Sequence, residues 1–184
     1  MKKPNNYDEY QLGGGKRLSA GGYICKIMQV EETKSKAGKE MVTISLDIAE
    51  GEYKGLYTEK YKSNTNANKK WGCIVYALTE GEYINTFLGF CKSVEASNGV
   101  GINWGDNFGA QFKGKTVGAV FGEEEFQGNN GVATAVKVRF FLPTADIVSD
   151  NFTVPEKKCL QPQPTTDTNG FFPATDVDDD DLPF

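Results

Sequence analysis

The 184-residue sequence contains no histidine. Histidine is the usual general base, the residue that activates serine and cysteine nucleophiles, and a frequent zinc ligand. Its absence excludes Ser-His-Asp and Cys-His nucleophile systems and most zinc sites. The sequence also lacks a Walker loop, because the stretch QLGGGKRLSAGG does not have GxxxxGK[ST] spacing. We therefore expect a protein that is not an enzyme and that holds no cofactor and no metal.

Paired cysteines and long apolar runs are also missing. The four cysteines, Cys25, Cys73, Cys91 and Cys159, are far apart and form no CxxC pair. No apolar run approaches the length of a membrane span, and the first residues, MKKPNNYDEY, lack the apolar segment of a signal peptide. These features predict reduced thiols, no membrane contact and a cytoplasmic location.

The charge of the chain is unevenly distributed. Residues 1–150 hold 18 bases and 18 acids, whereas residues 151–184 hold 2 bases and 7 acids, so the net charge of −5 belongs to the C-terminal part. Within the body, residues 1–70 hold 13 bases and 9 acids, and residues 71–150 hold 5 bases and 9 acids. This asymmetry favours an anionic partner for the first half and a different role for the acidic tail.

Short strands are the main pattern of the body. The stretch MVTISLDI alternates apolar and polar residues, as a half-buried strand does. Apolar residues recur at helical spacing from Trp71 to Leu78 and again from Ile84 to Val94, where Thr79 and Glu82 make a capping box. The Gly- and Asn-rich residues 97–112 have no assignment. The predicted strands are residues 22–31, 41–48, 56–62, 115–121 and 132–143.

Three strands, a helical segment and two strands follow the order of an OB-fold, a five-stranded, partly open barrel that binds oligonucleotides or oligosaccharides. We predict a mainly β protein with a helical insertion, a five-stranded OB-type barrel (β-β-β-α-β-β) with a disordered acidic C-terminal tail. The predicted parts are a flexible lead-in (1–21), the OB-fold domain (22–150), a disordered linker rich in Pro, Gln and Thr (151–175) and an acidic partner-binding tip (176–184).

The sequence ends in DVDDDDLPF. Most acidic runs are solvated surface. Here the acids are contiguous and apolar residues follow them, which suits capture by a basic pocket with an apolar slot. The stretch DDDDLPF resembles the tip of bacterial and phage single-stranded DNA-binding proteins, with leucine where isoleucine is more usual. In that family the tip recruits replication, repair and recombination proteins. The resemblance implies this role for Asp178, Asp179, Asp180, Asp181, Leu182, Pro183 and Phe184.

The body, over about residues 20–145, is similar to a second group of proteins. The matching stretches are GGYICKI, SKAGKEMVTISLDIAEGEYKG, KKWG, and FKGKTVGAVFGEEEF followed by NNG. They resemble a family of small proteins encoded by phages and prophages of Gram-positive bacteria. Members of that family are held to be single-stranded DNA-binding proteins near replication and recombination genes. The resemblance implies single-stranded DNA as partner and the cytoplasm of a bacterial host as location.

Binding of single strands without sequence preference needs cations for the phosphates and aromatic faces for the bases. Such residues occur in the polar loop 32–40, in LYTEKYK, in NKKWG and in the last predicted strand, and Lys16 and Arg17 in the lead-in could add contacts. Each candidate also has an alternative interpretation: the cations can belong to an ordinary solvated surface, and the aromatic residues can belong to the core. The candidates are Lys34, Lys36, Lys39, Tyr57, Lys60, Tyr61, Lys62, Lys69, Lys70, Trp71, Lys137, Arg139 and Phe141.

Three consecutive acids, Glu123, Glu124 and Glu125, lie in the predicted loop 122–131 and would repel phosphate there. Carboxylates can hold Mg²⁺ for phosphoryl transfer, but three consecutive side chains point in different directions. We therefore expect a non-catalytic protein that coats single-stranded DNA and recruits partners through its tip. The alternatives are an interaction adaptor with little DNA affinity and a strand-annealing protein, which would need a ring and longer helices. Homo-oligomers remain compatible with the sequence.

Overall fold

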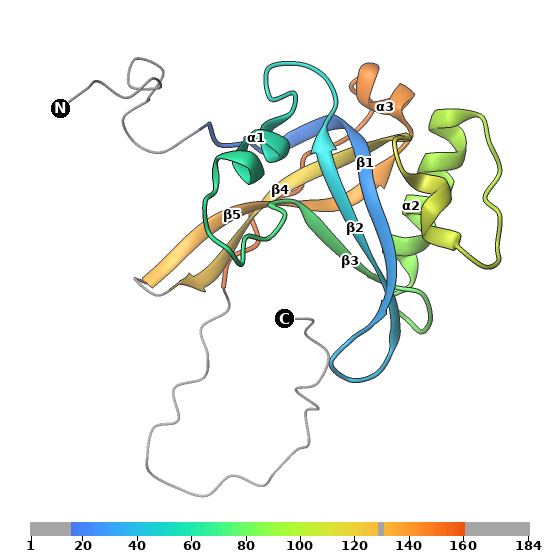
Figure 1. Cartoon of the computed structure of the whole chain (residues 1–184). Coiled ribbons are helices and arrows are strands. Elements are labelled where there is room, and N and C mark those ends of the chain that lie inside the picture. The colour runs from blue at the N-terminus through green and yellow to red at the C-terminus, as the bar shows by residue number, and fades with distance from the viewer. Residues whose placement is uncertain (1–15, 129–130, 161–184) are drawn as a thin grey trace, which may run out of the picture.

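The structure is a computed structural model that describes residues 16–128 and 131–160 (Figure 1). Five strands form one antiparallel sheet in the order β3-β2-β1-β4-β5. The prediction of a mainly β protein with five strands is confirmed. The sheet is not closed into a barrel, because β3 and β5 form its two edges. The strands are β1 (Gly21–Lys34), β2 (Glu40–Ile48), β3 (Ile74–Leu78), β4 (Thr116–Gly128) and β5 (Gly131–Leu142).

Three α-helices and one 3₁₀ helix connect and cover the strands: α1 (Leu56–Ser63), α2 (Asn85–Asn98), η1 (Phe108–Phe112) and α3 (Thr144–Val148). The predicted helix from Ile84 to Val94 is confirmed by α2. In the part of the chain described, no helix is long and apolar enough to cross a membrane.

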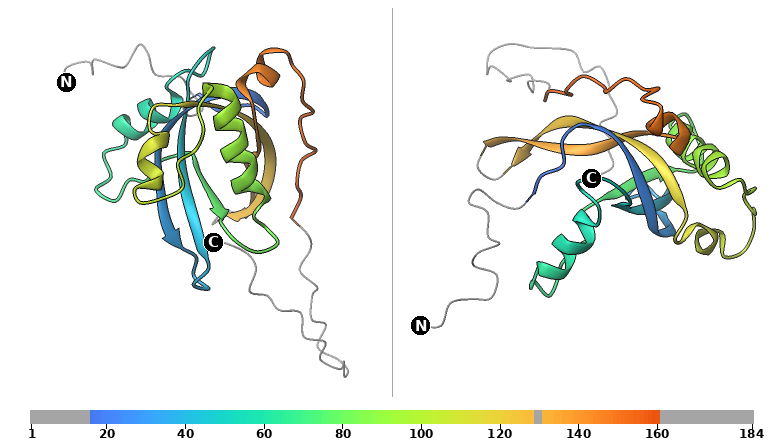
Figure 2. Two further views of the ribbon diagram at one scale, coloured as in Figure 1. Left: turned by 90° about the vertical axis from the view of Figure 1, so that its right-hand side faces the viewer. Right: turned by 90° about the horizontal axis from the view of Figure 1, so that it is seen from above.

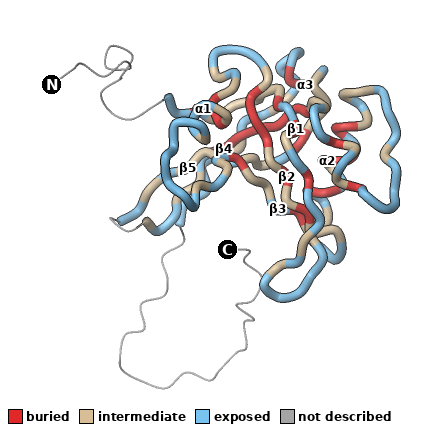
Figure 3. Tube along the Cα trace, in the orientation of Figure 1, coloured by how far each residue is buried: buried red, intermediate tan, exposed pale blue. Residues whose placement is uncertain are grey.

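The core lies between the sheet and helices α2 and η1, where the buried residues concentrate (Figure 3). Phe90 of α2 is fully buried, and its ring lies 5.1 Å from the ring of Phe112 and 5.2 Å from that of Phe141. Val42 and Ile44 of β2 contribute the apolar face that its alternation predicts. The sequence pattern of β2 therefore predicts its orientation correctly.

Residues 56–62, predicted as a strand, form helix α1, so that prediction is wrong. Gly55 precedes the helix with φ 73° and has no side chain that could cap the free N–H groups of the first turn. The carboxylate of Asp47 in β2 caps them instead. It accepts hydrogen bonds from the N–H of Tyr57 (2.9 Å) and of Thr58 (3.1 Å). The helix is thus fixed by a cap eight residues before Gly55, which the local sequence does not reveal.

The predicted helix from Trp71 to Leu78 is also wrong, since residues 74–78 form strand β3. Val75 and Ala77 lie opposite Ile44 and Val42 of β2 and turn toward the core. Pairing with an apolar strand therefore overrides a short helical pattern that Gly72 already weakens.

The β4–β5 hairpin is longer than predicted. Strand β4 continues to Gly128 and β5 starts at Gly131, so Glu123, Glu124 and Glu125 lie in a strand and not in a loop. Strand geometry directs Glu124 to the face opposite that of its two neighbours. The three acids are therefore separated between the two faces of the sheet.

A bulge in β5 shifts the alternation of its side chains. Phe140 lies opposite Val120, but Val138 lies opposite Phe121, so Arg139 is the extra residue. Phe140 is consequently exposed, whereas Val138 packs against the core. A strand without this bulge would place Val138 and Phe140 on one face.

Residues 143–160, here called the strap, leave β5 and run along the face of the sheet that points away from α1 and η1 (Figure 2). A Cβ atom on Gly22 would lie 2.4 Å from the ring of Phe152, and one on Gly122 would lie 3.2 Å from Pro155. The glycines therefore leave space into which the strap packs.

The end of the strap pairs with β4 beyond the point where β1 begins. The N–H of Lys158 donates to the carbonyl of Glu123 (3.0 Å), and the N–H of Glu125 donates to the carbonyl of Lys158 (2.8 Å). The side chain of Lys157 hydrogen-bonds to Glu125 and lowers the pKa of that carboxyl. Residues 151–160 of the predicted linker thus belong to the folded strap. The rest of the linker, the predicted tip and most of the lead-in (1–15) lie outside the described residues.

The cysteines give a first testable prediction. Cys25, Cys73 and Cys91 are buried and Cys159 is exposed. Burial raises the pKa of Cys73 and of Cys91 to about 12, and it also raises the pKa of Cys25. Because the thiolate is the reactive form, we expect one thiol to react rapidly with a disulfide reagent at pH 8. Four should react after unfolding in urea. Rapid reaction of a second thiol in the native protein, or of any thiol in Cys159→Ser, would contradict this burial.

Candidate nucleic-acid interface

The predicted polar loop 32–40 is shorter in the structure, because β1 continues to Lys34 and β2 begins at Glu40. Lys34 ends β1, and its ammonium group lies 2.8 Å from the carboxylate of Glu40, a contact that raises the pKa of this lysine. Lys36 and Lys39 are exposed in or beside the turn, where the N–H of Lys39 donates to the hydroxyl of Ser35 (3.0 Å). These lysines share the hairpin with acids, so they do not form a purely basic surface.

Helix α1 and the segment before β3 bring together aromatic rings and lysines. The rings of Tyr61 and Trp71 lie 5.5 Å apart, and the ammonium group of Lys69 lies 4.5 Å from the centre of the Tyr61 ring. The indole N–H of Trp71 donates to the carbonyl of Leu46 (2.7 Å), which fixes the indole against the sheet. We call these residues and their lysine neighbours the basic–aromatic cluster: Lys60, Tyr61, Lys62, Lys69, Lys70 and Trp71.

In the part of the chain that the structure describes, the lysines of the basic–aromatic cluster have no acidic partner. Residues 54–71 contain five lysines and one acid, Glu59. Among the described residues, no ion pair involves Lys60, Lys62, Lys69 or Lys70. Burial, together with the neighbouring cation of Arg17, lowers the pKa of Lys60. Like charges kept together without a counter-charge are typical of a site that binds anions.

Tyr57, a predicted stacking residue, belongs to the core instead. Its side chain is buried, and a Cβ atom on Gly72 would lie 2.9 Å from its ring. Burial raises the pKa of the Tyr57 hydroxyl. Tyr57 therefore has no face available for a base, although it lies only one helical turn from Tyr61.

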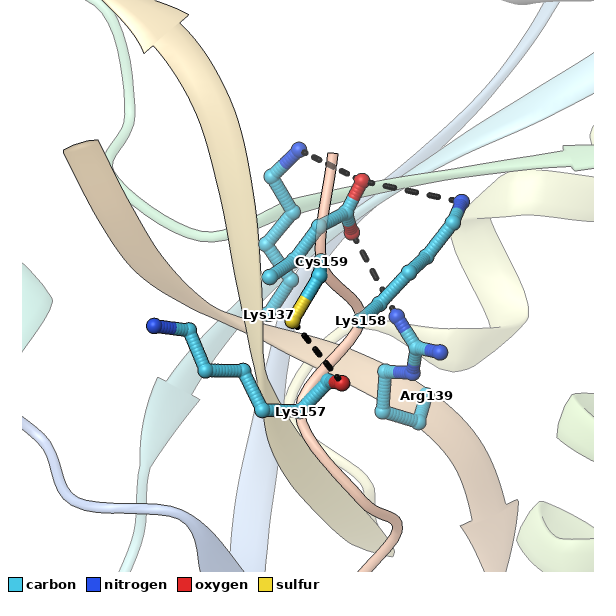
Figure 4. Close-up of polar contacts among 6 residues, drawn as sticks. Lys137, Arg139, Lys157, Lys158 and Cys159 are labelled. Carbon is cyan, nitrogen blue, oxygen red and sulfur yellow. Dashed lines mark hydrogen bonds and ion pairs between the residues drawn. The ribbon is translucent and has the colours of Figure 1, made fainter. Parts of the chain in front are cut away.

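The structure separates Phe141 from Lys137 and Arg139, with which it was predicted to form one face. Glu124 lies 3.4 Å from the guanidinium of Arg139, 3.7 Å from the ammonium of Lys137 and 3.8 Å from that of Lys158 (Figure 4). Phe141 is buried in the core. The cations of β5 thus share an acidic partner on β4, in contrast to those of the basic–aromatic cluster.

Sequence reasoning missed several residues at and around this site. Asp47 anchors α1, but its position inside an alternating strand carries no signal of that role. Tyr76 is exposed on the edge strand β3, in a segment predicted to be helical. Tyr53 was missed as well: its ring lies 5.1 Å from the ammonium group of Lys16, which gives part of the lead-in a contact with the domain.

Within residues 16–128 and 131–160, no group of three or more side chains is arranged to hold a metal ion. The alternation of Glu123, Glu124 and Glu125 along β4 explains why these acids do not converge. The arrangement of the basic–aromatic cluster, in contrast, is suited to binding an anion with aromatic contacts.

A comparison with protein families finds one match. The family described as "Protein of unknown function (DUF669)" matches residues 5–150, which is most of the chain and includes every strand. Its description assigns no activity or ligand. A search of curated proteins finds no match to the chain.

Proposed function

We propose that this chain, which belongs to the DUF669 family, binds single-stranded DNA without sequence preference and has no catalytic activity. The observation that carries the proposal is the basic–aromatic cluster. Its two rings are held against each other beside lysines that have no acidic partner in the described residues. Rings of this kind can stack on any base, and the lysines can neutralise the phosphates.

The resemblance of the body to phage and prophage single-stranded DNA-binding proteins supports the same function in the cytoplasm of a bacterial host. The ending DDDDLPF adds a second part to the proposal. We propose that residues 178–184 recruit replication, repair or recombination proteins while the domain holds the DNA. These residues lie outside the described structure, so their role rests on the sequence.

The test is fluorescence anisotropy of a labelled oligo-dT, with double-stranded DNA and RNA as comparisons, at several salt concentrations. Replacing Lys69 and Lys70 with glutamine should weaken binding about tenfold and reduce the salt slope by about 1.4, because two phosphate contacts are lost. Tyr61→Leu should weaken binding about fivefold through lost stacking.

The matched control is the double variant Lys137→Gln with Lys158→Gln, which removes the same charge from lysines that are paired with Glu124. It should change the affinity less than about twofold. An equal loss in both double variants would contradict the location of the site. Absence of binding at low salt would contradict the function itself.

The second candidate is an adaptor with little DNA affinity. It is favoured by the equal numbers of acids and bases in residues 1–150 and by the ion pairs that hold the cations around Glu124. Failure of the wild-type protein to bind oligo-dT, together with capture of replication or recombination proteins by a peptide of residues 176–184, would favour the adaptor.

A further inference from the structure

A pocket lies beside the turn end of the β1–β2 hairpin, and none of its described lining residues belongs to the basic–aromatic cluster. Its volume is about 520 Å³, within the range of about 300–1,000 Å³ that is typical of ligand pockets. Residues of β1, β2, α2 and the segment around η1 line it, together with Thr79, which follows β3. The residues on which the inference rests are Phe87, Trp104, Phe108, Glu32, Glu40 and Asp106.

Aromatic rings form one wall of the pocket. Trp104 stacks on Phe108 with ring centres 5.3 Å apart and 26° between the ring planes, and it meets Phe87 edge-on at 6.1 Å. Phe87 and Phe108 are buried, whereas Trp104 is 63% exposed. The indole is therefore held by the core and still presents a large apolar area to solvent, as residues that dominate binding interfaces do.

The polar lining of the pocket is acidic. Glu32 and Asp106 are exposed and take part in no ion pair among the described residues, whereas Glu40 is paired with Lys34. Among the described residues, no lysine or arginine lines the pocket. This charge would repel a phosphate backbone and attract a cation.

We propose that this pocket binds an arginine side chain of a partner protein. The aliphatic stem would lie on the aromatic wall, and the guanidinium would face Trp104 and the carboxylates of Glu32 and Asp106. Arginine fits better than lysine because its planar group stacks on an indole and donates to two carboxylates at once. The described lining of the pocket contains no residue of the proposed DNA-binding surface.

The test uses the full chain and the indole N–H signals of its two tryptophans in NMR spectra. The probe is the blocked peptide acetyl-Ala-Leu-Arg-Leu-Ala-amide, and its counterpart with citrulline has the same shape without the charge. The Trp104 signal, assigned with Trp104→Phe, should shift to saturation, and the arginine peptide should bind at least about fivefold tighter than the citrulline peptide. The signal of Trp71, which donates to Leu46, should stay unchanged.

Matched variants locate the site. Glu32→Gln combined with Asp106→Asn should weaken binding of the arginine peptide at least about fivefold, whereas Glu50→Gln, a change at another exposed acid, should not. Oligo-dT affinity should be the same in both variants as in the wild type. Equal affinity for the two peptides, no shift at millimolar peptide, or a larger Trp104 shift with oligo-dT would overturn the proposal.

Discussion

Replacing Asp47 with alanine is expected to lower the free energy of unfolding by about 3 kcal/mol. The carboxylate is buried and accepts hydrogen bonds from the N–H groups of Ile48, Tyr57 and Thr58 and from the Thr58 hydroxyl. Alanine would leave these donors without a partner and α1 without its cap. Urea unfolding followed by circular dichroism measures the change.

The control for this variant is Glu50→Ala, which removes an exposed acid near the end of the same strand and should change the free energy of unfolding by less than about 0.5 kcal/mol. A loss below about 1 kcal/mol in Asp47→Ala would show that water replaces the carboxylate and that the cap is not buried as described. Since α1 carries Lys60, Tyr61 and Lys62, a folded variant with a frayed α1 should also bind oligo-dT more weakly.

The second large effect is expected for Gly109→Ala. A Cβ atom at this position would lie 2.1 Å from the carbonyl oxygen of Val30. That oxygen belongs to strand β1 in the middle of the sheet, so it cannot move away without breaking strand pairing. We expect η1 to shift outward, at a cost of about 3 kcal/mol in the free energy of unfolding, measured by urea denaturation.

Gly89→Ala is the matched control, because a Cβ atom on this α2 residue meets nothing within 4 Å. Alanine in a helix is better than glycine by roughly 0.5–1 kcal/mol, so this variant should be more stable than the wild type. If Gly109→Ala is as stable as the wild type, the close approach of η1 to β1 described above is wrong.

Patterns that depend on the immediate neighbours predicted their elements well. The alternation in MVTISLDI predicts β2 and its buried face, and the helical spacing from Ile84 to Val94 predicts α2. Each of these elements buries one face, and the spacing of its own apolar residues defines that face. The segments KTVGAVF and VATAVKVRFFLP likewise predict the start of β4 and nearly the whole of β5.

Elements that depend on distant partners could not be predicted in this way. Helix α1 needs the carboxylate of Asp47, and β3 needs the apolar edge of β2. The same reason applies to the candidate site. Lys137 and Arg139 pair with Glu124 across the sheet, and nothing in the sequence near these residues indicates that pairing. The bulge at Arg139 also changes which side chains of β5 share a face.

The strap has a consequence for how the domain is completed during synthesis. Phe152 covers Gly22 near the start of β1, and Lys158 pairs with β4, so the first and last described parts of the domain meet. Chains emerge from the ribosome from the N-terminus at roughly 5–20 residues per second, and contacts between distant residues form last. The face of the sheet under the strap and the open edge of β4 are therefore covered only after residue 158 has been synthesised. Until then, the nascent chain exposes a strand edge that a chaperone or a second nascent chain could bind.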